Sequence, residues 1–253
     1  MDRHGMVAVV TGAGAGIGQA VARDLASRGV RVVVADLDPD SAATTAAAIR
    51  SDGGEATPSA GDVTSRDAIA SMIGSAERSF GGLDILINNA GGSTAPFFPD
   101  APIERWQRVI DVNLRGTMLA IQAAVPAMRR RGGGAIVNVA SSGGIGFASY
   151  ERPEYGAAKA GVVRLTASLG SLAQTDGIRV NCICPGLVDT PASRQERAKL
   201  VPDEQARLAA LALRPEQIAG AIWSLIGDET MAGRVMIWYE GQRLTLVPTD
   251  SPW

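Results

Sequence analysis

Short apolar stretches rich in β-branched residues alternate along this chain with longer segments of helical periodicity. Continuous apolar runs of this kind suit strands that are buried on both faces of a parallel sheet. Alternation with helices predicts right-handed βαβ units, so the predicted fold class is α/β, with a single doubly wound parallel sheet and helices on both faces. The predicted strands are Met6–Val10, Val30–Ala35, Ala56–Val63, Asp84–Asn88, Ala135–Val139, Ile178–Ile183 and Val235–Trp238.

Two predicted helices, Leu114–Met128 and Ala157–Ala173, are apolar around much of their circumference. Side chains such as Val162, Val163 and Leu165 cannot all face one sheet, and a helix that is apolar all round is buried all round. We therefore expect a homo-oligomer, either a dimer or a tetramer, whose subunit interface includes these two helices. The alternative is that small alanine side chains leave outer faces that need no cover.

Composition narrows the classes of partner. The chain has 253 residues, a net charge of −2 and no linker-like break, which predicts one domain over residues 1–253. It has no basic stripe and no apolar run of transmembrane length, so we expect neither nucleic acid nor a membrane as partner. Cys182 and Cys184 share one face of a predicted strand and lack a second pair of zinc ligands. We expect two buried thiols, no metal and a cytoplasmic location.

A glycine-rich turn follows the first predicted strand and opens a helix. Its glycines are Gly12, Gly14, Gly16 and Gly18, of which Gly12, Gly16 and Gly18 define the motif spacing, with Ile17 between the last two. Glycine permits a tight turn and lets backbone N–H groups approach a pyrophosphate, and the helix N-terminus adds partial positive charge. The spacing differs from G-x-G-x-x-G, and the Gly-Lys-Ser/Thr of a P-loop is absent. A dinucleotide is the predicted ligand, and a glycine-rich loop without a ligand is the alternative.

An acidic residue ends the second predicted strand. Asp36 lies 18 residues after Gly18, where a carboxylate would accept hydrogen bonds from the adenosine ribose. Its charge would repel a 2′-phosphate, and no arginine stands in the glycine loop or directly after Asp36. The predicted cofactor is therefore NAD rather than NADP. An ordinary turn carboxylate is the alternative.

A tyrosine and a lysine form the strongest candidate for chemistry. Tyr155 and Lys159 are four residues apart, so they share one face of a helix, and only one other lysine, Lys199, occurs in the chain. An adjacent ammonium favours the phenolate, which predicts a lowered Tyr155 pKa and a general acid/base. Tyr150 is a second phenol nearby, but it lacks a lysine partner and is better suited to a pocket wall.

Taken together, these motifs resemble the classical short-chain dehydrogenase/reductase family over roughly residues 5–227. The resemblance implies a Rossmann fold that binds a nicotinamide cofactor and exchanges hydride with a small alcohol or ketone. The residues that carry it are Thr11–Gly18, Asp62, Val63, Asn88–Gly91, Asn113, Ser142, Tyr155, Lys159, Pro185, Gly186 and Thr190.

The resemblance also implies a role for each catalytic residue. Tyr155 would exchange a proton with the substrate oxygen, Ser142 would hydrogen-bond that oxygen, and Lys159 would hold the nicotinamide ribose and lower the Tyr155 pKa. Asn113 would kink its helix and hold a water of a proton relay behind Lys159. We assign the serine role to Ser142 because it lies 13 residues before Tyr155, the spacing usual in the family. Ser141 is the alternative.

Further cofactor contacts follow from the same resemblance. Asn88 belongs to the same loop, but its amide side chain has the alternative role of fixing loop backbone. The implied contacts are Asp62 and Val63 at the adenine, Asn89, Ala90 and Gly91 under the adenosine ribose, and Pro185, Gly186, Val188 and Thr190 at the nicotinamide carboxamide.

Two regions leave the substrate open. The stretch 191–215 is expected to be a mobile amphipathic lid, with a cationic contact to an acidic substrate as the sharper alternative. Arg152, next to Glu151, is also placed to reach substrate. The C-terminal segment departs from the family's usual last turn, which puts the subunit contacts in doubt, and Trp253 lies at its end.

The sequence thus predicts an NAD-dependent oxidoreductase that interconverts a secondary alcohol and a ketone. A reductive ketoreductase or enoyl-type reductase of the same family is the nearest alternative. A non-catalytic NAD-binding sensor is the alternative from another functional class.

Overall fold

One sheet runs through the centre of the molecule. The structure, a computed structural model, describes residues 4–146 and 150–248. Within these residues, eight strands pair in the order β3-β2-β1-β4-β5-β6-β7-β8, and every pair is parallel except the antiparallel β7–β8. The strands are β1 Val7–Thr11, β2 Arg31–Asp36, β3 Ala56–Ala60, β4 Ile85–Asn88, β5 Gly134–Val139, β6 Ile178–Pro185, β7 Val235–Trp238 and β8 Thr245–Leu246.

The predicted α/β class and doubly wound sheet are confirmed, with local differences at strand ends. The prediction ran the third strand to Val63, but β3 ends at Ala60. Its end coincides with a turn in which Asp62 accepts hydrogen bonds from the N–H and hydroxyl of Thr64 at 2.9 and 2.8 Å. Such a side-chain turn competes with the sheet for the backbone. The two-residue β8 was not predicted, because it is too short to show a pattern.

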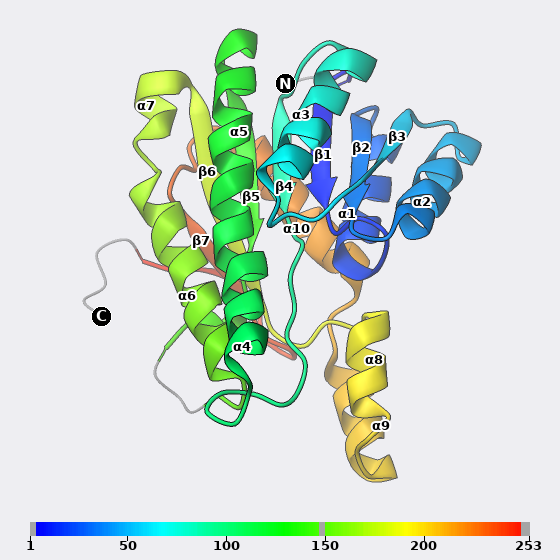
Figure 1. The fold of residues 1–253 in the computed structure, drawn as a ribbon, viewed down its shortest axis with the longest axis vertical. Coiled ribbons are helices and arrows are strands. Elements are labelled where there is room, and N and C mark those ends of the chain that lie inside the picture. The colour runs from blue at the N-terminus through cyan, green and yellow to red at the C-terminus, as the bar shows by residue number, and fades with distance from the viewer. Residues whose placement is uncertain (1–3, 147–149, 249–253) are drawn as a thin grey trace.

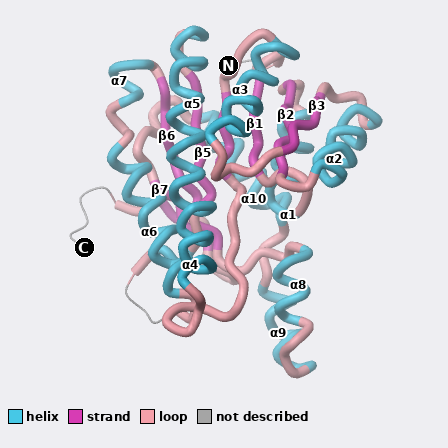
Figure 2. The backbone as a smooth tube through the Cα atoms, in the orientation of Figure 1, coloured by secondary structure: helices cyan, strands magenta, loops and turns pink. Residues whose placement is uncertain are grey.

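Helices cover both faces of the sheet (Figures 1 and 2). One apolar cluster joins the sheet to α1, α2 and α10, and a second joins it to α3 and α5. No helix in the described residues is long and apolar enough to span a bilayer. The helices are α1 Gly16–Ser27, α2 Pro39–Ser51, α3 Arg66–Phe80, α4 Ile103–Ile110, the π-helical turn η1 Asp111–Arg115, α5 Gly116–Arg131, the 3-10 turn η2 Ser142–Gly144, α6 Pro153–Ser168, α7 Leu172–Asp176, α8 Pro191–Arg197, α9 Pro202–Leu211 and α10 Pro215–Gly227.

The predicted helix over residues 157–173 is two helices in the structure, because α6 ends at Ser168 and α7 begins at Leu172. Gly170 lies at the break, where a Cβ would come within 3.1 Å of the Gly233 backbone. Val162 and Val163 on α6 are buried within the same chain, whereas Leu165 is partly buried. Packing within the chain therefore covers part of the apolar circumference, and the subunit interface stays a prediction.

Candidate active site

The candidate residues gather at the carboxyl edge of the sheet. Strands β1, β2, β4, β5 and β6 are parallel, so the loops that follow them leave from one edge. Figure 1 shows α4 and the paired helices α8 and α9 at this same end of the molecule. The edge therefore combines the glycine-rich turn after β1 with the Tyr155 region after β5.

The glycine-rich turn has the form of a phosphate cradle. Its close packing requires glycine at Gly18, where a Cβ would lie 2.1 Å from the carbonyl oxygen of Gly12. Helix α1 follows with Ala15 at its N-cap, and no side chain caps its first turn. Uncapped N–H groups at a helix N-terminus bind anions. The local structure therefore fits a dinucleotide pyrophosphate.

Asp36 lies beside this cradle. Its Oδ2 accepts a hydrogen bond from the Gly14 N–H at 2.7 Å, and its Oδ1 accepts one from Asp38 N–H at 3.1 Å. The next residue, Leu37, is exposed. The carboxylate is thus fixed by backbone donors at the end of β2, at the position that a ribose-binding acid requires.

Asp62 forms an ion pair that the sequence did not reveal. Arg108 on α4 donates from Nη2 to Asp62 Oδ2 at 2.7 Å and from Nη1 to Thr64 Oγ1 at 2.9 Å. Burial raises the pKa of Asp62, but hydrogen bonds from Thr64 and Arg108 outweigh it, so this pKa lies below its usual value. The carboxylate therefore remains an acceptor for an amine donor at neutral pH.

Two asparagines fix the loops around the cradle. Asn89 donates from Nδ2 to the carbonyl oxygens of Thr11 and Gly12, both at 3.0 Å. Asn88 joins a buried chain instead, donating to Asn138 Oδ1 at 2.8 Å. The Asn88 side chain thus links β4 to β5 rather than fixing loop backbone, and its expected part in the ribose loop stays a prediction.

Asn113 lies in the π-helical turn η1 between α4 and α5. Its Oδ1 accepts from Gly92 N–H at 3.0 Å, and its Nδ2 donates to Gly92 O at 2.8 Å and to Val109 O at 2.9 Å. The bond to the i−4 carbonyl oxygen accompanies the predicted irregularity of this helix. A Cβ on Gly91 would lie 2.4 Å from Asn113 Oδ1, so glycine is required there.

Lys159 is buried beneath Tyr155. Its Nζ donates to the carbonyl oxygen of Val139 at 2.8 Å and lies 5.5 Å from the centre of the Tyr155 ring. Burial lowers the pKa of Lys159 to about 8, and the neighbouring thiols of Cys182 and Cys184 oppose that effect. Both thiols are buried and unoxidised, with their sulfurs 3.9 Å apart, as the sequence predicted.

The predicted lowering of the Tyr155 pKa is wrong for the chain by itself. Burial raises the pKa of Tyr155 to about 12, and Tyr150 adds to the increase. Hydrogen bonding by Ser141 and the charge of Arg152 act in the opposite direction without reversing it. The expectation weighed only the neighbouring ammonium, whereas desolvation of the phenolate dominates here.

Ser141, the alternative to Ser142, acts on both nearby phenols. Its hydroxyl lowers the pKa of Tyr155 and that of Tyr150, whose rings lie 6.4 Å apart, and it accepts a hydrogen bond from Gly143 N–H at 3.2 Å. Ser141 is extended, with φ −164° and ψ 152°, and Ser142 begins the turn η2. The spacing of 13 residues selects Ser142, whereas the effect of Ser141 on the Tyr155 pKa favours Ser141, so the choice between the two serines stays a prediction.

Glu154 is a site residue that sequence reasoning missed. This carboxylate is buried, accepts from Ser93 Oγ at 3.2 Å and accepts from Phe98 N–H at 3.2 Å. It ties the loop after β4 to the first turn of α6, directly before Tyr155. In sequence it looks like an ordinary acid at a helix N-terminus, so no pattern distinguished it.

The loop after β6 closes the site on its other side. A Cβ on Gly16 would lie 3.1 Å from Thr190 Cγ2, which places this loop against the glycine-rich turn. Thr190 caps α8 through a hydrogen bond from Ser193 N–H at 3.2 Å. The unusual C-terminal turn contributes here, since Glu240 Oε2 accepts from Leu187 N–H at 3.1 Å. Trp253, named above, lies outside the described residues.

Known proteins share this architecture and its motifs. The family model described as short chain dehydrogenase matches residues 6–201. The chain belongs to the short-chain dehydrogenase family. It is 42% identical over 233 residues to cis-4-hydroxycyclohexanecarboxylate dehydrogenase from Sinomonas cyclohexanicum, covering 88% of this chain and 89% of the relative. An uncharacterized oxidoreductase of Staphylococcus aureus (strain MW2) is 36% identical, covering 82% and 90%.

A solved structure of the same family extends the similarity to three dimensions. It is a crystal structure of a tryptophan variant of actinorhodin polyketide ketoreductase with NADPH, with a TM-score of 0.87 and 32% identity. The alignment covers 95% of this chain and 98% of that chain. The short-chain dehydrogenase family binds nicotinamide cofactors, and the cradle described above fits one.

Replacing Lys159 by methionine should stabilise this short-chain dehydrogenase while removing its activity. A pKa near 8 in the folded chain and near 10 in the unfolded chain means that burial of the ammonium destabilises the fold fully below pH 8. Between those values the unfolded chain binds more protons, so stability rises with pH. At pH 7 we expect the free energy of unfolding of Lys159→Met to exceed that of the wild type by on the order of 2 kcal/mol. This difference should shrink by pH 10. Denaturant titrations at both pH values measure it, and a constant difference would contradict the burial argument.

Proposed function

We propose that this protein is an NAD-dependent oxidoreductase that interconverts a secondary alcohol and a ketone by hydride transfer. The observation that carries the proposal is the grouping of Tyr155, Ser141 and Lys159, with the Lys159 ammonium 5.5 Å from the Tyr155 ring centre, at the sheet edge that also holds the cradle. When bound, the nicotinamide cofactor supplies the hydride acceptor and, in its oxidised form, a positive charge.

Each residue has a distinct part in the proposed chemistry. In the oxidative direction Tyr155 takes the hydroxyl proton of the alcohol as the phenolate and becomes the phenol, and in the reductive direction the phenol donates its proton to the ketone oxygen. Ser141 donates a hydrogen bond to the same substrate oxygen, where charge develops. Lys159 supplies positive charge below the phenol, and Asn113 maintains the loop that covers Lys159.

The substrate class follows from the family relative and sets the first experiment. A 4-hydroxycyclohexanecarboxylate is a secondary alcohol, so we propose cyclic hydroxy acids as the first substrates to test. NADH formation is followed at 340 nm with hydroxy acids, neutral cyclic alcohols, sugars and sterols, in parallel with NADP. Turnover of a secondary alcohol with NAD supports the proposal, whereas tight NAD binding without turnover of any alcohol or ketone would favour a sensor.

A reductive role is the second candidate. The high pKa of Tyr155, about 12, keeps the phenol protonated at neutral pH and suits proton donation to a ketone oxygen. Similarity to a polyketide ketoreductase points the same way. Measuring both directions on one alcohol–ketone pair, with NADH and NADPH, distinguishes the two roles.

Asp36 should decide the choice of cofactor. The fixed carboxylate would accept hydrogen bonds from the ribose hydroxyls of NAD and repel the 2′-phosphate of NADP. Asp36→Ala should reduce the ratio of kcat/KM for NAD to that for NADP by about tenfold. Asp40→Ala, which removes an exposed acid from the first turn of α2, is the matched control and should leave the ratio unchanged. An unchanged ratio in Asp36→Ala would refute the assignment.

We also propose that the protein acts as a cytoplasmic homo-oligomer. Met118 on α5 and Ile103 on α4 are exposed large apolar side chains, which support a contact between copies on this side of the molecule. Light scattering on the purified protein would establish the number of subunits.

A further inference from the structure

Arg152 stands where three segments around the site meet. It occupies the N-cap position of α6, three residues before Tyr155. Its guanidinium carbon lies 5.3 Å from the ring centre of Phe97, in the loop after β4. Its charge also helps to lower the pKa of Glu196 on α8. The hydrogen bond from Lys199 is the largest cause of that lowered pKa, and the charge of Arg152 is the smallest. The guanidinium therefore lies between the loop after β4, helix α6 and the α8 helix.

The same charge faces the reacting group. Arg152 is near enough to Tyr155 and Tyr150 to lower the pKa of both phenols, against the larger opposing effect of burial. Its side chain is 26% exposed, so the cation is half-enclosed and solvent screens it less than it screens a surface arginine.

Most of the hydrogen-bond donors of this guanidinium have no partner among the described residues. Its Nε contacts Glu151 Oε1 at 3.3 Å, and the side chain of Glu151 is 73% exposed. Such a pair between adjacent residues is weak. Within the described residues, the Nη1 and Nη2 groups of Arg152 have no hydrogen bond or ion pair. Two parallel N–H donors at the rim of a site match a carboxylate in bidentate geometry.

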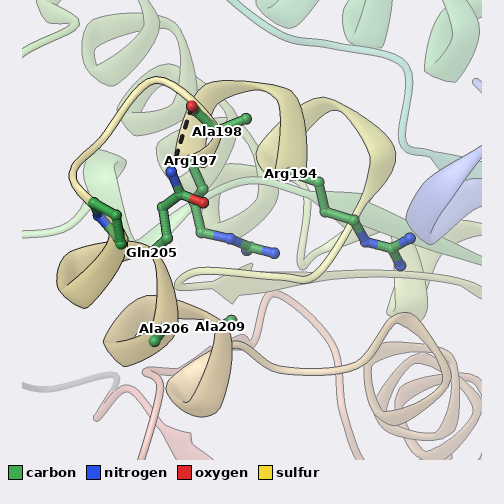
Figure 3. A pocket seen from close by; sticks show the side chains of 7 residues that line it. Arg194, Arg197, Ala198, Gln205, Ala206 and Ala209 are labelled. Carbon is green, nitrogen blue, oxygen red and sulfur yellow. Dashed lines mark hydrogen bonds between the residues drawn. The ribbon is translucent and has the colours of Figure 1, made fainter.

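Unlike Arg152, two arginines of α8 have guanidinium groups that are paired with a carboxylate of the protein. Arg194 and Arg197 line a pocket of about 430 Å³ between α8 and α9 (Figure 3). Both are paired with one carboxylate, that of Asp189, whose pKa they hold below its usual value. Their charge is thus partly satisfied within the protein, and the pocket they line lies between the two helices rather than against Tyr155.

We propose that Arg152 is a specificity residue that binds the carboxylate of an anionic hydroxy-acid substrate and so holds its hydroxyl at Tyr155. This inference rests on the proposed function and deepens it, because it assigns the recognition of the acid group to one side chain. Phe97 keeps the guanidinium plane in place, and Nη1 and Nη2 provide the two donors. Glu151 and Glu196 give way to the stronger bidentate partner.

Steady-state kinetics on two substrates test the assignment. The substrates are cis-4-hydroxycyclohexanecarboxylate and its primary carboxamide, which has the same shape and no charge. Arg152→Gln should raise KM for the carboxylate about 10- to 100-fold, the effect of losing charge-assisted hydrogen bonds, with little change in kcat. The carboxamide should lose less than threefold in kcat/KM, and Arg152→Lys should recover part of the carboxylate activity.

Two further measurements keep the test decisive. Arg164→Gln removes the same charge from an exposed position later on α6, and it should leave both substrates unaffected. Cyclohexanecarboxylate, which has no hydroxyl to oxidise, should bind the wild-type protein in the presence of NAD, and binding to Arg152→Gln should be at least tenfold weaker by calorimetry. That result would support the role of Arg152 even if no alcohol were oxidised and the proposed function failed. Equal losses on the two substrates, or undiminished carboxylate binding in Arg152→Gln, would overturn the inference.

Discussion

Tyr155→Phe should reduce kcat by about 10² to 10⁴, the contribution typical of a positioned general acid/base. The substitution removes one hydroxyl, the proposed proton donor and acceptor, whose pKa Ser141 lowers against the larger effect of burial. The phenyl ring keeps the packing, so we expect an unchanged fold by circular dichroism and unchanged cofactor affinity. Rates at saturating alcohol and cofactor measure the loss.

Tyr150→Phe is the matched control for that experiment. The pKa of Tyr150 is also lowered by Ser141, and its ring lies 6.4 Å from that of Tyr155, but Tyr150 is exposed and the described residues place no lysine against it. Its removal should leave most of the turnover. If Tyr150→Phe lost the activity and Tyr155→Phe kept it, the roles of the two phenols would be reversed. Near-normal turnover in both variants would exclude acid/base catalysis by a tyrosine.

The pH profile adds a signature of the phenol. A pKa of about 12 leaves Tyr155 protonated at neutral pH, so alcohol oxidation requires further positive charge at the site. The Lys159 ammonium and the oxidised nicotinamide ring both carry such charge. The kcat of oxidation should therefore rise from pH 7 toward alkaline pH in the wild type, and this dependence should vanish in the residual activity of Tyr155→Phe.

The strands could be predicted because their physical cause is local to each segment. Runs such as those in β1 and β2 are buried on both faces, and burial on both faces leaves a continuous apolar signature. The glycine-rich turn was equally readable, since its close contacts exclude any Cβ at Gly18. The prediction of a ribose-binding role for Asp36 rested on its place at the end of a predicted strand.

The parts that failed depend on contacts between distant segments. The pKa of Tyr155 is set mainly by burial, which the spacing to Lys159 does not report. The Arg108–Asp62 ion pair joins residues 46 apart in the chain. Glu154 binds Ser93 and Phe98 from 61 and 56 residues away. Patterns of a few residues carry no signal for such pairs.

Replacing Ser141 and replacing Ser142 by alanine should have very different effects on kcat. Ser141→Ala should reduce kcat by about 10² to 10³, the cost of removing one donor at an oxygen where charge develops. The physical basis is the effect of its hydroxyl on Tyr155, whose pKa it lowers against burial, which places Ser141 beside the proposed reacting group. The measurement is kcat at saturating substrate, together with cofactor affinity, which should not change.

Ser142→Ala is the control with the same atoms removed one residue later. Ser142 begins the turn η2 directly after Ser141, the serine whose hydroxyl acts on the pKa of Tyr155. We expect less than a threefold loss of kcat in this variant. A large loss in Ser142→Ala with little loss in Ser141→Ala would instead support Ser142, the assignment made from the spacing of 13 residues.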